Sequence, residues 1–97
     1  MKELLGMPPR NDAELLALIR KNDDRAFALL YNKYRNPLLN FAAHYLSDQD
    51  SCEEVLQQLF VQLHIRRISL KISSRVSSYL FTAMRNKIFN YFPQLLL

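Results

Sequence analysis

The sequence predicts an all-α fold, a compact helical bundle of about four helices. Apolar residues recur at steps of three and four over long segments, which is the period of a helix. Only one of the 97 residues is glycine, which leaves little material for tight hairpins. The apolar content of 49% is typical of a folded chain, and this length suits one domain with one modest core. We expect that domain at residues 11–93, after an extended, flexible arm at residues 1–10 and before a tail at residues 94–97.

The first helix is short. Either Asn11 or Asp12 can accept hydrogen bonds as its N-cap, and the helix should end near Arg20. Its apolar face consists of Leu15, Leu16 and Ile19. A polar break follows, in which Asp23 or Asp24 can cap the next helix.

The second helix has the clearest pattern in the chain. Its apolar positions keep the helical period for about five turns. They are Phe27, Leu30, Tyr31, Tyr34, Leu38, Phe41, Ala42 and Tyr45. Pro37 lies among them and should kink or split the helix, because proline removes one backbone donor and crowds the preceding turn.

Two further helices are predicted, from about residue 50 to 65 and from about residue 75 to 92, where Pro93 ends the second of them. The first should bury Val55, Leu56, Leu59, Phe60 and Leu63. The second should bury Val76, Tyr79, Leu80, Ala83, Met84, Ile88 and Tyr91. The segment between them is predicted to be a loop, since residues 68–72 could form a strand but nothing else in the chain could pair with it.

Charge is divided unevenly along the chain. No acidic residue follows Glu54, and six of the 13 basic residues do. The first 54 residues hold all nine acids and seven basic residues, so they carry about −2 and the remainder +6 of the net +4. This division favours a polyanionic partner for the second half, with nucleic acid the leading candidate. The alternative is a solvated basic face without a partner.

Catalytic and metal-binding patterns are absent from the sequence. His44 and His64 have no ligand partner at metal spacing, and His44 is expected to be partly buried. Cys52 begins a helix, which could lower its pKa, but no histidine accompanies it at a recognisable spacing. Glu53 and Glu54 are adjacent and diverge on a helix, and one glycine cannot build a phosphate loop. We therefore expect no enzyme, no metal and no cofactor.

The location of the protein is predicted from what the chain lacks. The sequence shows no signal-peptide pattern, and no apolar run approaches the roughly 18 residues of a membrane span. A single cysteine cannot form an internal disulfide. These features favour a cytoplasmic protein without a membrane span.

Two surfaces remain as candidate sites. The first is a polar ridge on the third helix, which comprises Glu53, Glu54, Gln57 and Gln58. This ridge suits a helical protein partner, although an ordinary solvated face would have the same composition. The loop and last helix combine basic groups that can hold phosphates with Ser and Asn side chains that can read base edges. These candidates for DNA binding are Leu70, Lys71, Ser73, Ser74, Arg75, Ser77, Ser78, Arg85, Asn86, Lys87 and Asn90. Phe81 and Phe89 could stack on bases or simply belong to the core.

Three segments in order resemble region 2 of bacterial extracytoplasmic-function sigma factors. Residues 24–34, DRAFALLYNKY, followed by LLNFA at 38–42, are similar to the opening of that region. CEEVLQQLF at 52–60 resembles its acidic and glutamine-containing segment. SYLFTAMRNKIFNY at 78–91 is similar to its final helix, including the arginine–asparagine pair. The resemblance covers about residues 12–92.

The resemblance implies a domain that docks on core RNA polymerase and captures the promoter minus-ten element. Glu53, Glu54, Gln57 and Gln58 would then meet the clamp helices of the largest polymerase subunit. The loop at residues 66–78 would form a pocket for a base flipped from the non-template strand, with Leu70, Lys71 and Asn86 as its best candidates. An anti-sigma factor is a further expected partner.

The same resemblance implies a linker and a second helical domain that reads the minus-thirty-five element. These would follow region 2, so we do not expect independent promoter initiation from the 97 residues alone. The family usually has tryptophan where this chain has Tyr79, and often an aromatic residue near Leu70.

Two other functions compete with this interpretation. The first is a helical interaction module that binds polymerase or an anti-sigma protein without touching DNA. The second is a helix-turn-helix reader of duplex DNA, which would need a short helix and a turn near residues 66–92.

Overall fold

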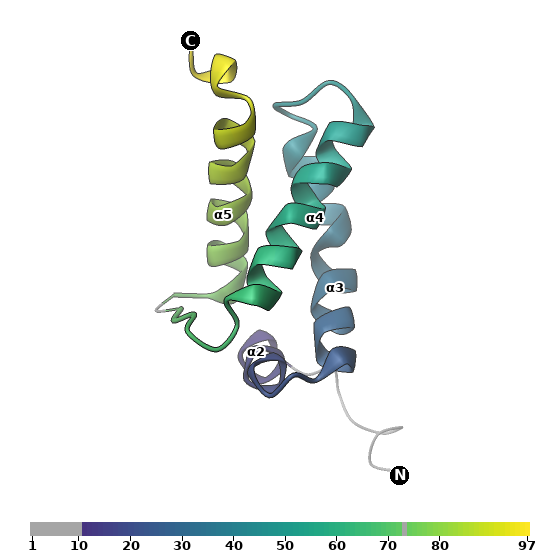
Figure 1. The fold of residues 1–97 in the computed structure, drawn as a ribbon. Helices are drawn as coiled ribbons and strands as arrows, with labels where there is room; N and C mark the ends of the chain where they lie inside the picture. The colour runs from purple at the N-terminus through teal and green to yellow at the C-terminus, as the bar shows by residue number, and fades with distance from the viewer. Residues whose placement is uncertain (1–10, 73) are drawn as a thin grey trace.

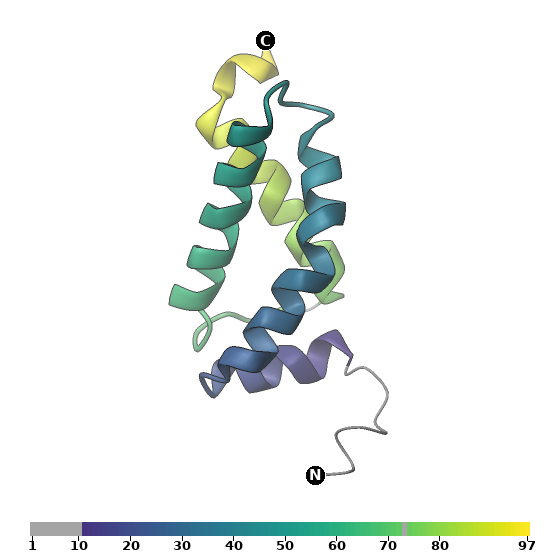
Figure 2. The same ribbon diagram turned by 90° about the vertical axis from the view of Figure 1, so that its right-hand side faces the viewer.

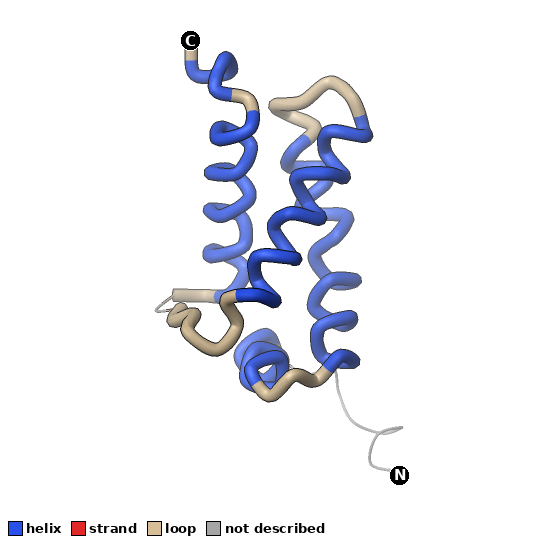
Figure 3. Tube along the Cα trace, viewed as in Figure 1, coloured by secondary structure: helices blue, strands red, loops and turns tan. Residues whose placement is uncertain are grey.

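The computed structural model describes residues 11–72 and 74–97. This part of the chain folds into four α-helices and a 3-10 turn, without a strand, as Figures 1 and 3 show. The elements are α2 (Asp12–Arg20), α3 (Asp24–Ala42), α4 (Gln49–Ile65), α5 (Val76–Tyr91) and η1 (Pro93–Leu96). The all-α bundle is thereby confirmed. The predicted arm at residues 1–10 lies outside the described residues.

Three helices form the body of the molecule. Helices α3, α4 and α5 run side by side, and α2 lies across one end of them, as the two views in Figures 1 and 2 agree. Each of the three packs against the other two, while α2 packs mainly on α3. The core between them is entirely apolar in the described residues. This arrangement leaves one long face of each helix available for partners.

Side-chain caps define where three of the helices begin. Asn11 accepts from the backbone N–H of Glu14 at 2.8 Å and completes a capping box for α2. Asp23 caps α3, and Asp48 caps α4. From the sequence, Asn11 or Asp12 could cap the first helix and Asp23 or Asp24 the second. Asp48 was not predicted as the cap of the third helix. Arg75 stands at the N-cap of α5 without a side-chain hydrogen bond.

Pro37 lies inside α3, which continues unbroken from Asp24 to Ala42. The helix axis changes direction along its length in Figure 2, as expected where proline removes a backbone donor. The predicted split at Pro37 does not occur, and a kink at that residue stays a prediction.

The buried residues follow the predicted stripes with a few corrections. Helix α4 buries all five expected residues and Cys52 in addition. Tyr91 is predicted to face inward, yet half of its surface is exposed, because it is the last residue of α5 and no further turn of that helix covers it. His44 is exposed rather than partly buried, because α3 ends before it, and its Nδ1 lies 2.9 Å from the carbonyl oxygen of Asn40.

The connection from α4 to α5 contains no second helix in its described residues, 66–72 and 74–75. A helix-turn-helix reader of duplex DNA needs two short helices at this place. The single helix α5 that follows the loop does not supply that motif.

Candidate functional site

The polar ridge on α4 is present but divides between two edges of the helix. Glu53 is half-buried, and its Oε2 lies 2.5 Å from Nη2 of Arg35 on α3. Glu54 lies at the opposite edge, beside Tyr91 at the end of α5. Glu54, Gln57 and Gln58 are all exposed. The ridge thus offers three free polar side chains and one glutamate that is already paired.

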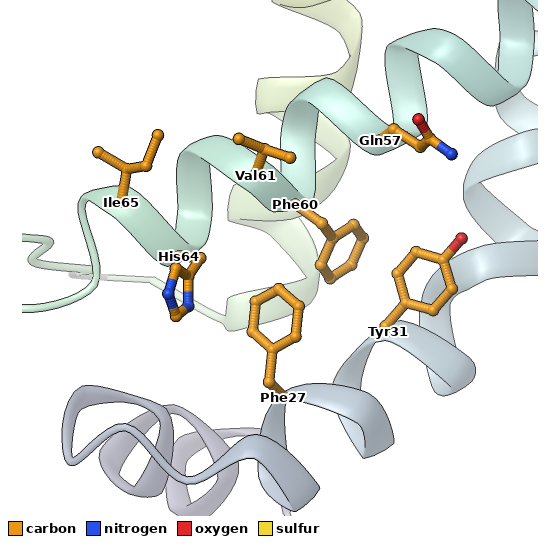
Figure 4. Close-up of a pocket in the computed structure, with 7 residues that line it drawn as sticks. All are labelled: Phe27, Tyr31, Gln57, Phe60, Val61, His64 and Ile65. Atoms are coloured by element: carbon orange, nitrogen blue, oxygen red, sulfur yellow. The ribbon is translucent and has the colours of Figure 1, made fainter.

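An apolar groove lies beside this ridge, between α3 and α4 (Figure 4). Its volume is about 350 Å³, and Gln57 stands at its edge. The rings of Phe27 and Tyr31 on α3 meet Phe60 on α4 edge to face, with centroids 5.9 and 5.0 Å apart. The remaining lining residues are Val61, His64 and Ile65.

Two apolar side chains that line the groove are exposed to solvent. Val61 is 52% exposed and Ile65 is 69% exposed. Val61 and Ile65 are apolar residues beside the predicted buried stripe of α4, and this position in the sequence is the signal that marks the surface. A partner that contacts Gln57 would reach these two side chains as well.

The loop after α4 exposes most of its polar side chains, whereas Arg67 and Leu70 are half-buried. Lys71, Ser74 and Arg75 are exposed. Leu70 is half-buried and packs against the core, and its backbone oxygen accepts a hydrogen bond from Nη2 of Arg20 at 2.9 Å. Leu70 is predicted to line a base pocket, and its side chain is partly exposed as well as packed against the core. Ser73, another predicted contact, lies outside the described residues.

A second groove, with both polar and apolar walls, lies between α4 and α5. It has a volume of about 280 Å³ and brings together three predicted residues, Asn86, Lys87 and Asn90. Lys87 donates from Nζ to Oε1 of Gln62 on α4 at 2.5 Å, which joins the two walls. The groove is also lined by Arg66 and Thr82, and by four residues that were not predicted to contribute: Leu59, Gln62, Tyr79 and Ala83.

The other predicted residues of α5 lie on two further faces. Ser78 and Arg85 are exposed, and the Arg85 guanidinium lies 4.9 Å from the ring centroid of Phe89. Ser77 is half-buried. Phe81 packs edge to face on Phe41 of α3 and lies against the core, and Phe89 packs edge to face on Tyr45, which follows α3.

The chemistry of Cys52 differs from the expectation. Its side chain is buried, and burial raises the pKa of the thiol, with the carboxylates of Asp48 and Glu53 acting in the same direction. The expected lowering at a helix start is therefore wrong. Within residues 11–72 and 74–97 there is no group of three potential metal ligands, and none of the described helices is long and apolar enough to cross a membrane.

Comparison with known families decides the relationship. The family described as sigma-70 region 2 matches residues 30–94, which is most of the chain. The chain belongs to the sigma-70 region 2 family. This result confirms the resemblance on which the sequence interpretation depends.

A solved structure supports the same assignment for this region 2 domain. The domain is similar to an engineered region 2 of sigmaE, solved as a complex with GTAAAA, with a TM-score of 0.79 and 25% sequence identity. The match covers 91% of this chain and 93% of that chain. The neighbour is in accord with the extracytoplasmic-function type. A search of curated proteins gave no match.

Proposed function

We propose that this region 2 domain is a non-enzymatic module of transcription initiation in the cytoplasm. It binds core RNA polymerase and captures the unpaired non-template strand of the promoter minus-ten element. The observation that carries the proposal is the likeness, over nine-tenths of both chains, to a region 2 that was solved with GTAAAA. An anti-sigma factor is a further expected partner.

The DNA-binding half of the proposal uses the loop and the groove between α4 and α5. Lys71 and Arg75 are exposed where the loop enters α5, so they can hold the sugar–phosphate backbone. Asn86 and Asn90 line the groove and can pair with the edge of a base that has left the stack. Flipping a base costs a few kcal/mol, which such hydrogen bonds and stacking can offset.

The polymerase-binding half uses the ridge and the apolar groove of α3 and α4. Glu54, Gln57 and Gln58 provide polar contacts, and the groove beside Gln57 can accept the apolar face of a helix. Two helices of a clamp offer both kinds of surface together. We therefore assign the clamp helices of the largest polymerase subunit to this face.

The proposal is tested by retention of the purified chain on bacterial core RNA polymerase. We expect core RNA polymerase to retain the wild type and not to retain a Glu54→Lys/Gln57→Ala double variant. An Asn32→Lys/Asn40→Ala variant, which changes two exposed residues of α3, is the control and should be retained. No retention of the wild type at micromolar concentration would contradict the proposal.

A second candidate function is an interaction module that binds polymerase or an anti-sigma factor without DNA. The packing of Leu70 against the core favours it, because less of this side chain is then free to contact a base. Binding of single-stranded GTAAAA by the wild type would exclude this candidate. Retention on polymerase without any such binding would establish it.

A further inference from the structure

Arg20 connects two parts of the molecule that are far apart in the sequence. It is the last residue of α2, and its Nη2 donates to the backbone oxygen of Leu70 at 2.9 Å. The two residues are 50 positions apart. Arg20 is exposed and Leu70 is half-buried. A charged donor thus holds one carbonyl group of the loop that precedes α5.

The other hydrogen bonds of this loop are local. The N–H of Leu70 donates to the oxygen of Arg66 at 2.9 Å, and the hydroxyl of Ser69 donates to the same oxygen at 3.3 Å. Arg67 donates from Nη1 to the oxygen of His64 at 2.8 Å. Among the described residues, only the Arg20 bond joins residues 66–72 to a helix other than α4.

The anchoring point lies directly before the exposed basic residues of the loop. The Leu70 side chain packs against the core, while Arg20 holds its carbonyl group. Lys71 is the next residue, and Ser74 and Arg75 follow before α5 begins. Fixing Leu70 at both its side chain and its backbone therefore fixes the place from which these residues extend.

We propose that Arg20 is a positioning residue, which holds the loop in the conformation that receives unpaired DNA. The inference rests on the proposed function of the loop. A loop that is already ordered loses less conformational entropy when it binds, so a preorganised loop binds DNA more tightly. Hydrogen bonds from charged donors are stronger than neutral ones, which suits an anchor at an exposed site.

The test measures binding of fluorescein-labelled single-stranded GTAAAA by anisotropy at several salt concentrations. We expect Arg20→Ala to weaken binding about tenfold, the effect of losing one charge-assisted hydrogen bond. The slope of log K against log salt should not change, because a positioning residue releases no counterion. Arg20→Lys should recover part of the affinity, since an ammonium group can still donate to the carbonyl oxygen.

Lys21→Ala is the matched control, because it removes the same charge from the next, exposed residue. It should leave the affinity within about twofold of the wild type, since the Lys21 side chain donates no hydrogen bond to the described residues of the loop. Unchanged affinity in Arg20→Ala would overturn the proposal. A salt slope smaller in magnitude by about 0.7 in Arg20→Ala would also overturn it, because Arg20 would then be a direct phosphate contact.

Hydrogen exchange of the loop amides gives a measurement that does not depend on DNA. Arg20→Ala should accelerate exchange in residues 68–72 about fivefold or more, while Lys21→Ala should not, because local opening follows the loss of local contacts. If the wild type binds no GTAAAA, the DNA-binding part of the proposed function fails. The exchange rates then still decide whether Arg20 anchors the loop, and unchanged rates would reject that role.

Discussion

The hydroxyl group of Tyr34 donates a hydrogen bond to the carboxylate of Asp12, which joins α3 to α2. Lys33 holds the other oxygen of the same carboxylate from its Nζ at 2.7 Å. Tyr34 is only 8% exposed, so its phenol is removed from water where it meets Asp12. Burial, followed by the hydrogen bond and negative charge of Asp12, raises the pKa of Tyr34 to about 12.

Alkaline pH should destabilise the domain through Tyr34. Its pKa in the unfolded chain is about 10, so the folded state favours the neutral phenol. This contribution is fully present below pH 10 and is lost as the pH rises toward about 12. Circular dichroism in denaturant titrations between pH 8 and about 12 should show the loss of stability.

The Tyr34→Phe variant provides the comparison for this effect. At neutral pH it should be less stable by about 1 kcal/mol, because it loses the hydrogen bond to Asp12. Between pH 10 and about 12 its stability should fall less steeply than that of the wild type. Parallel curves for the two proteins over this range would contradict the assignment to Tyr34.

The helices could be predicted because their information is local. The spacing of Leu30, Tyr34 and Leu38 is enough to place one face of α3 in the core. The sequence alone could not supply partners across helices. Arg35 is 18 positions from Glu53, and no periodic pattern marks that pairing.

The direction of a loop side chain was equally hidden from the sequence. Leu70 could have faced a bound base or the core, since both environments are apolar. In the structure its side chain is half-buried and packs against the core, and that packing depends on the whole chain. Asn86, Lys87 and Asn90 line one groove in the structure, and their role in DNA binding stays a prediction.

Exposed apolar residues of the α3–α4 groove should contribute to polymerase binding without contributing to stability. Ile65→Ser should change the free energy of unfolding by less than about 0.5 kcal/mol, because Ile65 is mostly exposed. It should weaken retention on core RNA polymerase about tenfold, the effect of losing one buried apolar contact in a complex. Thermal unfolding and a pull-down titration measure the two quantities.

Leu29→Ser is the control for this experiment. Leu29 is 55% exposed, as an apolar residue of α3 that does not line the groove. The same chemical change there should leave retention as in the wild type. If both variants lost the same share of retention on polymerase, any exposed apolar side chain would contribute equally, and the groove would have no special role.

Basic residues of the loop and of α5 should determine how salt weakens DNA binding. The slope of log K against log salt is negative, and each phosphate contact to single-stranded DNA contributes about 0.7 to its magnitude. Lys71→Ala and Arg85→Ala should therefore each make the slope shallower by about 0.7. Arg85→Ala should also reduce stability by about 0.5 to 1 kcal/mol, because Arg85 lies over the ring of Phe89. Arg25→Ala, on α3, should keep the wild-type slope.

Asn86 and Lys87 should have different effects, although they line the same groove. The amide of Asn86 can donate and accept, as pairing with a base edge requires, whereas Lys87 carries a charge. Asn86→Ala should therefore reduce the preference for one base by about 1 to 3 kcal/mol and leave the salt slope unchanged. Lys87→Ala should weaken binding to every base by a similar factor and reduce the slope. Binding of GTAAAA and of single-base variants by both proteins, at three salt concentrations, separates the two roles. If Asn86→Ala lowered the slope, or if Lys87→Ala altered base preference alone, the roles assigned to these residues would be wrong.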